Sequence, residues 1–301
     1  MTQATGINSR LTYVEEQNWG VTPATPEMKV LNSNYGESLV AEAGEIVSNA
    51  MNPNRGVVGT RNGQIKVSGS VPFELPLNGI GSIMKGALGS VVTTGPDVNG
   101  MYTHVLKRSK TLPSFTFEKG FTDVGQYFIY RGCRIGALDL KCKPDGAAEG
   151  SFELMGKNIS TSQTTLDATP TLVTHKAFMN FEGGLLEGGA SAKLLDLSFK
   201  ITNGLYDARV VGSRESANIG AGKSEVTGSI TVMFEDLTYF TKWLNETETS
   251  LQLTYQNGNY STQFYFPRVK YNGQGSPAIQ SQEGIVLTLN FRALIDNALG
   301  T

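Results

Sequence analysis

A short alternating stretch occurs twice in this chain, and its recurrence limits the possible folds more than any other feature. Residues 67–75 read Val-Ser-Gly-Ser-Val-Pro-Phe-Glu-Leu, and residues 226–234 read Val-Thr-Gly-Ser-Ile-Thr-Val-Met-Phe. Hydrophobic side chains recur at alternate positions in both stretches. A period of two residues predicts a β-strand with one apolar face and one polar face.

The surroundings of this stretch recur as well, in the same order along the chain. The matching segments are 48–51 with 202–205, 55–59 with 209–212, 82–87 with 239–244, 114–117 with 250–254, 126–129 with 263–266 and 149–155 with 283–291. Each match is weak alone, but their common order indicates an internal duplication of about 150 residues per copy.

The predicted fold is mainly β, with two tandem β-sandwich or barrel domains that each hold one short α-helix. Frequent glycine, at 35 residues, favours many short strands joined by turns. Helical spacing of hydrophobic residues places the first helix within 78–88, and its counterpart at 239–244. The polar stretch after Gly156 is typical of a linker. We therefore expect an N-terminal arm (1–37), a first domain (38–158), a linker (159–180) and a second domain (181–301).

The N-terminal arm leaves two interpretations open. Such a segment either lies on a neighbouring molecule, with Trp19 as an anchor, or covers its own domain with that side chain. Two long segments between matching strands, 49–63 and 203–222, leave a similar choice, and we call them the first and the second arm. Each either reaches another molecule or folds back on its own domain as a hairpin.

Composition excludes several classes of protein. The formal net charge is −2, which does not suggest a basic face for nucleic acid, and no run of about 18 apolar residues predicts a membrane span. The first residues lack the layout of a signal peptide, so we expect the chain to stay in the compartment where it is made. Cys133 and Cys142 could pair across a hairpin, although two free thiols in a reducing cytoplasm are favoured. Two histidines without a cysteine cluster do not suggest zinc.

Motifs for catalysis or cofactor binding are missing, so we expect no enzyme and no cofactor. Gly222-Lys223-Ser224 ends like a phosphate-binding loop, but Ala217 stands where that loop needs glycine and a strand is expected to follow. The acidic pairs Glu15–Glu16 and 235–236 are adjacent in sequence, which does not place two carboxylates across a cleft. Aromatic residues in 127–130 and 264–266 could form a sugar-binding platform, but at strand spacing they more often fill a core.

The ordered segments resemble the tail tube proteins of tailed bacteriophages, including those with two fused copies of the tube domain. The resemblance rests on the strand ending at residues 199–205, the arm with Arg209-Val210-Val211-Gly212, the strand 226–232, and 234–237 leading into the helix. It covers most of 38–155 and 190–295. Pro72 stands inside the first strand where the second copy has Thr231. The same resemblance extends to the tube protein of type VI secretion.

The resemblance implies a structural subunit of stacked rings, with three chains giving pseudo-sixfold symmetry around a channel for the genome. Its implied partners are other copies of the chain, the tape measure protein and double-stranded DNA in the channel, and the tail terminator and baseplate proteins, without a membrane. It implies a place in the virion tail after assembly in the host cytoplasm. The alternative function is a β-sandwich module on a phage or cell surface that binds carbohydrate.

Two groups of residues are candidates for contacts in such a tube. Small polar side chains on the repeated strands suit a channel wall, because many Lys or Arg residues would hold phosphates; these are Ser68, Ser70, Thr227, Ser229 and Thr231. Residues in the two arms suit contacts with the next ring; these are Arg55, Val57, Val58, Arg209, Val210 and Val211.

Overall fold

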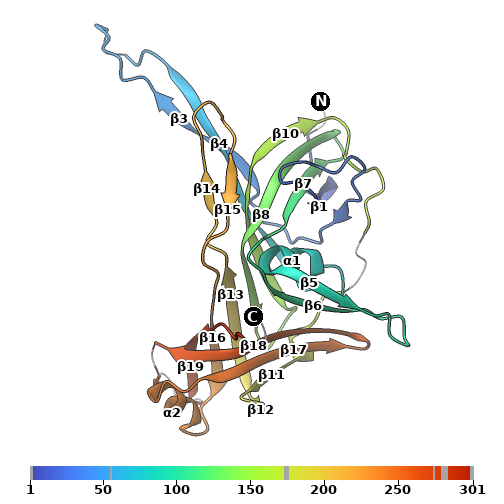
Figure 1. Ribbon diagram of the computed structural model, residues 1–301, viewed down its shortest axis with the longest axis vertical. Coiled ribbons are helices and arrows are strands. Elements are labelled where there is room, and N and C mark those ends of the chain that lie inside the picture. The colour runs from blue at the N-terminus through green and yellow to red at the C-terminus, as the bar shows by residue number, and fades with distance from the viewer. Residues whose placement is uncertain (1–2, 55, 173–175, 274, 279–283, 299–301) are drawn as a thin grey trace.

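The computed structural model describes residues 3–54, 56–172, 176–273, 275–278 and 284–298, and it is mainly β, as predicted (Figure 1). The first half contains η1 (Gly6–Asn8), β1 (Ser9–Glu16), β2 (Lys29–Val30), β3 (Val40–Val47), β4 (Thr60–Glu74), α1 (Gly81–Leu88), β5 (Gly89–Thr94), β6 (Thr103–Arg108), β7 (Ser114–Phe121), β8 (Gln126–Cys142), β9 (Glu149–Gly156) and β10 (Asn158–Ser162). The second half contains η2 (Asn180–Glu182), β11 (Gly183–Glu187), β12 (Ala190–Ala192), β13 (Leu194–Thr202), β14 (Tyr206–Ala208), β15 (Asn218–Gly220), β16 (Glu225–Met233), α2 (Thr238–Leu244), β17 (Thr249–Asn257), β18 (Tyr260–Asn272) and β19 (Val286–Ala293).

The two halves hydrogen-bond their strands in the same order. In the first copy the neighbours run β3–β4–β9–β8–β7–β1, and in the second they run β13–β16–β19–β18–β17–β11. A short helix follows the second strand of each series, α1 after β4 and α2 after β16. The repeated stretches of the sequence are therefore β4 and β16, at equivalent places in two units of one topology.

The glycine of the repeated stretch is needed for close packing in both copies. A Cβ on Gly69 would lie 2.6 Å from the backbone oxygen of Ser38, and one on Gly228 would lie 2.3 Å from that of Ser198. Ser38 and Ser198 are themselves equivalent, because they lie opposite Ser70 and Ser229 in the two copies. Backbone atoms cannot yield as a flexible side chain can, so the repeated glycine reflects the same close approach twice.

Each copy is a sandwich whose core lies between two layers of one bent sheet. In the first copy β8 joins the layers, because its first part pairs with β7 and β10 and its second part with β9. Register shifts mark the bend, as expected where a strand passes between layers. Phe117 of β7 meets Phe152 of β9 across the core, with ring centroids 6.1 Å apart. In the second copy Phe199 of β13 lies 5.1 Å from Phe266 of β18.

The two copies share one continuous sheet. The second part of β8 pairs with β13 from Ala137↔Thr202 to Cys142↔Leu197, and we call this ladder the internal joint. Asn203 extends the joint, because its buried side-chain amide donates to the carbonyls of Ala87 and Ile135 at 2.8 and 3.0 Å. Its two donors are thereby satisfied by the end of α1 and by β8 of the other copy.

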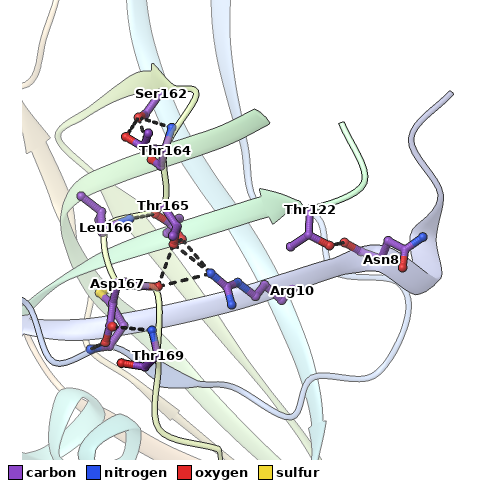
Figure 2. A network of polar contacts seen from close by, with 11 residues as sticks. Asn8, Arg10, Thr122, Ser162, Thr164, Thr165, Leu166, Asp167 and Thr169 are labelled. Carbon is purple, nitrogen blue, oxygen red and sulfur yellow. Dashed lines mark hydrogen bonds and ion pairs between the residues drawn. The ribbon is translucent and has the colours of Figure 1, made fainter. Parts of the chain in front are cut away.

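The segment after β10 is fastened to the first copy by a polar network (Figure 2). The Thr165 hydroxyl accepts a hydrogen bond from Arg10 at 2.8 Å and donates to buried Glu118 at 2.6 Å. The second carboxylate oxygen of Glu118 accepts from the Leu166 amide at 2.6 Å. Asp167 accepts a further bond from the Met28 amide at 3.0 Å. These contacts hold β1, β7 and the chain leading to the second copy together.

The N-terminal residues are integrated in the sheet of the first copy. β1 pairs along its whole length with β7, and Trp19 donates to the carbonyl of Gly132 at 3.1 Å. Of the two interpretations of Trp19, the structure shows the side chain on its own domain. The domain boundaries 1–37, 38–158, 159–180 and 181–301 stay a prediction.

Most expected elements are present, with a few differences. Both helices form, and β3, β7, β9, β13, β16, β17, β18 and β19 cover the predicted strands. The hydrophobic patterns of residues 126–130 and 135–140 each predict a short separate strand, but both segments belong to the single strand β8. Gly132, with φ of 64°, and Gly136 interrupt the alternating pattern there without ending the strand.

Candidate functional site

One face of the shared sheet is polar across both copies. The alternation of β4 and β16 buries Val67, Val71, Val226 and Ile230, and it turns the intervening side chains to the opposite face. We call this the polar face; it includes Ser68, Ser70, Asp139, Lys141, Ser151, Glu153, Ser198, Lys200, Thr227, Ser229, Thr231, Thr288, Asn290 and Arg292. All of the residues predicted to line a channel therefore lie on one face.

Side chains on the polar face bond mainly to one another. The hydroxyls of Ser198 and Ser229 lie 3.0 Å apart, and those of Thr231 and Thr288 lie 2.9 Å apart. The Ser151 hydroxyl donates to Asp139 at 2.7 Å. Such cross-strand pairs stabilise a sheet and leave a surface of short, self-satisfied polar groups.

Charges on the polar face are paired across strands. Lys200 of the second copy contacts Glu153 of the first at 2.6 Å, across the internal joint. Glu225 lies 2.7 Å from Lys223 and 3.2 Å from Arg292. The hydrogen bond from Lys223, with the charge of Arg292, lowers the pKa of the Glu225 carboxyl. Lys200 and Arg292 on this face therefore have acidic neighbours, which reduces their attraction for phosphates.

In the part of the chain that the structure describes, the shared sheet ends on both sides in strands with an unpaired edge. Among the described residues, β3 pairs with β4 and with no other strand. At the other side, β18 pairs with β19 over residues 269–272, and within the described ranges residues 286–289 of β19 pair with β16 alone. In the first copy, the equivalent part of β9 forms hydrogen-bonded pairs with β8. Unpaired backbone groups at such edges are sites for pairing with another chain.

The two arms differ in shape. The first arm continues the β3–β4 hairpin and projects beyond the rest of the fold (Figure 1). Val57 and Val58 near its tip are exposed. The second arm, with β14 and β15, lies beside β4, where the Ile65 amide donates to the carbonyl of Arg214 at 2.9 Å.

The residues predicted for inter-ring contact divide between these arms. Arg209 donates to Asp207 at 2.7 Å and to Gln64 at 3.2 Å, so its guanidinium is engaged within the chain. Val210 and Val211 are exposed in the second arm. Arg55 lies outside the described residues.

The features considered for other chemistry have structural roles. Ser224 leads into strand β16 and not into a helix, and the described residues hold no cluster of side chains suited to a metal ion. Of the aromatic residues in 127–130 and 264–266, Tyr130 and Phe266 are buried in the two cores, whereas Tyr265 is exposed. Cys133 and Cys142 are buried free thiols, and burial raises the pKa of both.

None of the helices in the described part of the chain has the length and apolar character needed to span a membrane.

Comparison with known proteins agrees with this architecture. A family model for phage tail tube proteins matches residues 6–293. The chain belongs to the phage tail tube protein family. A comparison with curated proteins finds no match. As a tail tube protein it is a structural component of the virion tail, and its family is not an enzyme family.

The sequence identified the polar face of this tube protein but not its edges. The alternating pattern of β4 and β16 is sufficient to assign residues to a face. The internal joint has no comparable signal, because β8 and β13 are far apart in sequence and each reads as an ordinary strand. Residues 103–106 were predicted as a strand and lie in β6, but its hairpin partner β5 was missed, because β5 follows α1 directly and the helix pattern obscures its start.

Proposed function

We propose that this tube protein forms rings of three chains that stack into a tube, with the polar face turned toward a channel for the genome. The observation that supports this proposal is that two copies of one topology already share a continuous sheet within a chain. The resemblance to tube proteins implies six tube domains per ring, so two copies per chain, joined head to tail by a contact that repeats the internal joint, would give a closed ring of three chains with pseudo-sixfold symmetry. Closure of the sheet also removes its free edges.

The polar face suits a channel through which double-stranded DNA slides. Its short Ser and Thr side chains, including Ser70 and Ser229, offer no long cationic groups to phosphates. Lys200 and Arg292 are paired with carboxylates. A wall with unpaired lysines would bind DNA by release of counterions and slow its passage. We assign Ser68, Ser70, Thr227, Ser229 and Thr231 to this wall.

In this proposal, the two arms make the contacts between stacked rings. The exposed Val57 and Val58 of the first arm, and Val210 and Val211 of the second, supply apolar surface that is unfavourable to leave in water. Arg55 and Arg209 accompany them as candidate contacts. The tape measure protein would occupy the channel before DNA, the terminator and baseplate proteins would cover the two ends, and assembly would take place in the host cytoplasm.

Electron microscopy combined with cysteine protection tests this proposal. The purified chain should form rings or tubes as its concentration rises. A Ser229→Cys variant should react with a bulky PEG-maleimide as free chains and become protected in tubes, because its thiol then faces the channel. A Val92→Cys variant on the exposed β5–β6 hairpin is the matched control and should react in both states. Chains that stay monomeric at all concentrations would refute the proposal.

A further inference from the structure

We propose that stacked rings have one rotational register, in which the first arm of a chain meets Glu74 and Glu149 of a chain in the next ring. This inference rests on the proposed function and deepens it by naming the surface that receives each arm. That surface is the end of the shared sheet opposite the arms. It is acidic in the first copy and apolar in the second, so it distinguishes the two arms.

The two copies end their strands of the shared sheet in chemically different pairs. Glu74 of β4 lies opposite Glu149 of β9, and we call these residues the acidic pair. Met233 of β16 lies opposite Val286 of β19, and we call these residues the apolar pair. The two pairs occupy equivalent places, because each follows the repeated glycine by the same number of residues.

Both pairs are unfavourable in an unassembled chain. Glu74 and Glu149 are exposed, and like charges directly opposite on neighbouring strands destabilise a sheet. Lys141 of β8 also lies opposite Glu149 and offsets part of this charge. Met233 and Val286 are 47% and 43% exposed at the end of a polar face. A partner that brings positive charge to one pair and apolar surface to the other would relieve both.

The arms lie at the other end of the same strands. The first arm leads into β4, which ends at Glu74, and the second arm leads into β16, which ends at Met233. The nine residues of β16 span about 30 Å at the rise of a β-strand. The first arm projects away from its own sheet, so it is directed at a chain stacked beyond it and not at its own acidic pair (Figure 1).

The two arms differ in charge as the two pairs do. Residues 49–63 contain two arginines and no acidic residue, whereas residues 203–222 contain two arginines, one aspartate and one glutamate. Within the second arm, Arg209 also forms an ion pair with Asp207 at 2.6 Å. The positive first arm therefore complements the acidic pair. The second arm, which exposes two valines without net charge, complements the apolar pair.

A match at both arms fixes the rotation between rings. Rotation of one ring by a single copy would place the positive arm on Met233 and Val286. It would also cover Glu74 and Glu149 with the uncharged arm, and carboxylates that lose water without gaining a partner are unfavourable. The matched register is therefore preferred, and the stack has threefold and not sixfold symmetry.

Cross-linking of assembled full-length chains tests this register. Ser151 and Thr288 lie at equivalent places beside the two pairs, because they face Pro72 and Thr231. Val58→Cys combined with Ser151→Cys should join chains through a short flexible bis-maleimide. Val58→Cys combined with Thr288→Cys is the matched control for the rotated register, and we expect at least about tenfold less product from it. The two native cysteines are buried and should not react.

Exchange of the two pairs should reverse this preference. Glu74→Met, Glu149→Val, Met233→Glu and Val286→Glu together leave the composition of the chain unchanged and move each pair to the other copy. The Thr288→Cys product should then exceed the Ser151→Cys product, and urea denaturation verifies that the exchanged chain is folded. Glu74→Gln with Glu149→Gln is a milder variant of the same shape, which should reduce the parent preference at least about threefold.

The outcomes separate this inference from the proposed function. Tubes that give the two cross-linked products in equal amounts would overturn the register and leave the proposed function in place. A folded exchanged chain that keeps the parent preference, or a glutamine variant that keeps all of it, would overturn the register as well. Chains that form neither tubes nor cross-links would overturn both.

Discussion

Substitution of Gly228 by alanine should destabilise the second copy strongly. The new Cβ would lie 2.3 Å from the Ser198 carbonyl oxygen and 2.5 Å from the Phe291 ring, both well inside normal contact. The ring can shift, but the oxygen belongs to the β13–β16 ladder. Overpacking of a tight core costs about 1–3 kcal/mol, and we expect about 3 kcal/mol because a backbone atom must move. That cost corresponds to a change of roughly two orders of magnitude in the folding equilibrium.

Urea denaturation of the unassembled chain measures this effect, with the unfolding of the second copy followed by the fluorescence of Trp243. Gly184→Ala in β11 is the matched control, since a Cβ there meets nothing within 4 Å. The control should be neutral or stabilise by up to about 1 kcal/mol. A Gly228→Ala chain within about 0.5 kcal/mol of the parent would refute the explanation of the repeated glycine.

Three further predictions concern buried or paired groups. Glu16→Ala should lower the free energy of unfolding by about 3 kcal/mol in urea titrations, because the buried carboxylate accepts bonds from Ser114, Thr116 and the Gly132 amide, which would lose their partner. Ellman's reagent at pH 8 should label Cys133 at least about a hundredfold faster in urea than in the folded chain, since burial raises the pKa of that thiol and blocks access. The pKa of Glu225 is lowered in the folded chain, so its contribution to stability is present above its unfolded pKa of about 4.3 and is lost as pH falls through the folded value. Glu225→Gln should therefore flatten the acid limb of the stability curve measured by urea titrations between pH 2 and 6, and an unchanged limb would contradict this assignment.

The sequence predicts local structure well wherever one face of an element is buried. The alternation in β4 and β16 predicts both the strands and their faces, because burial on one side imposes a period of two residues. Hydrophobic spacing in residues 78–88 likewise predicts α1. These patterns also establish the duplication, which the common strand order of the two copies bears out.

Long-range pairing was not predictable in the same way. β1 joins β7, and β8 joins β13, through backbone hydrogen bonds that leave no residue-specific signal in a single sequence. The bend in β8 hides its continuity, since Gly132 and Gly136 resemble strand ends. The free edges follow only from knowing which pairings are already made, so the candidate site required the structure.

The exposed β5–β6 hairpin distinguishes the first copy from the second. Its two strands pair with each other and, among the residues that the structure describes, with no other strand; the hairpin follows α1 directly, whereas α2 is followed almost directly by β17. The two copies thus present unlike surfaces despite their common topology. A closed assembly of three chains would display this hairpin at alternate tube domains around its circumference. A ligand that recognises the hairpin would therefore bind such a ring at three sites and not at six.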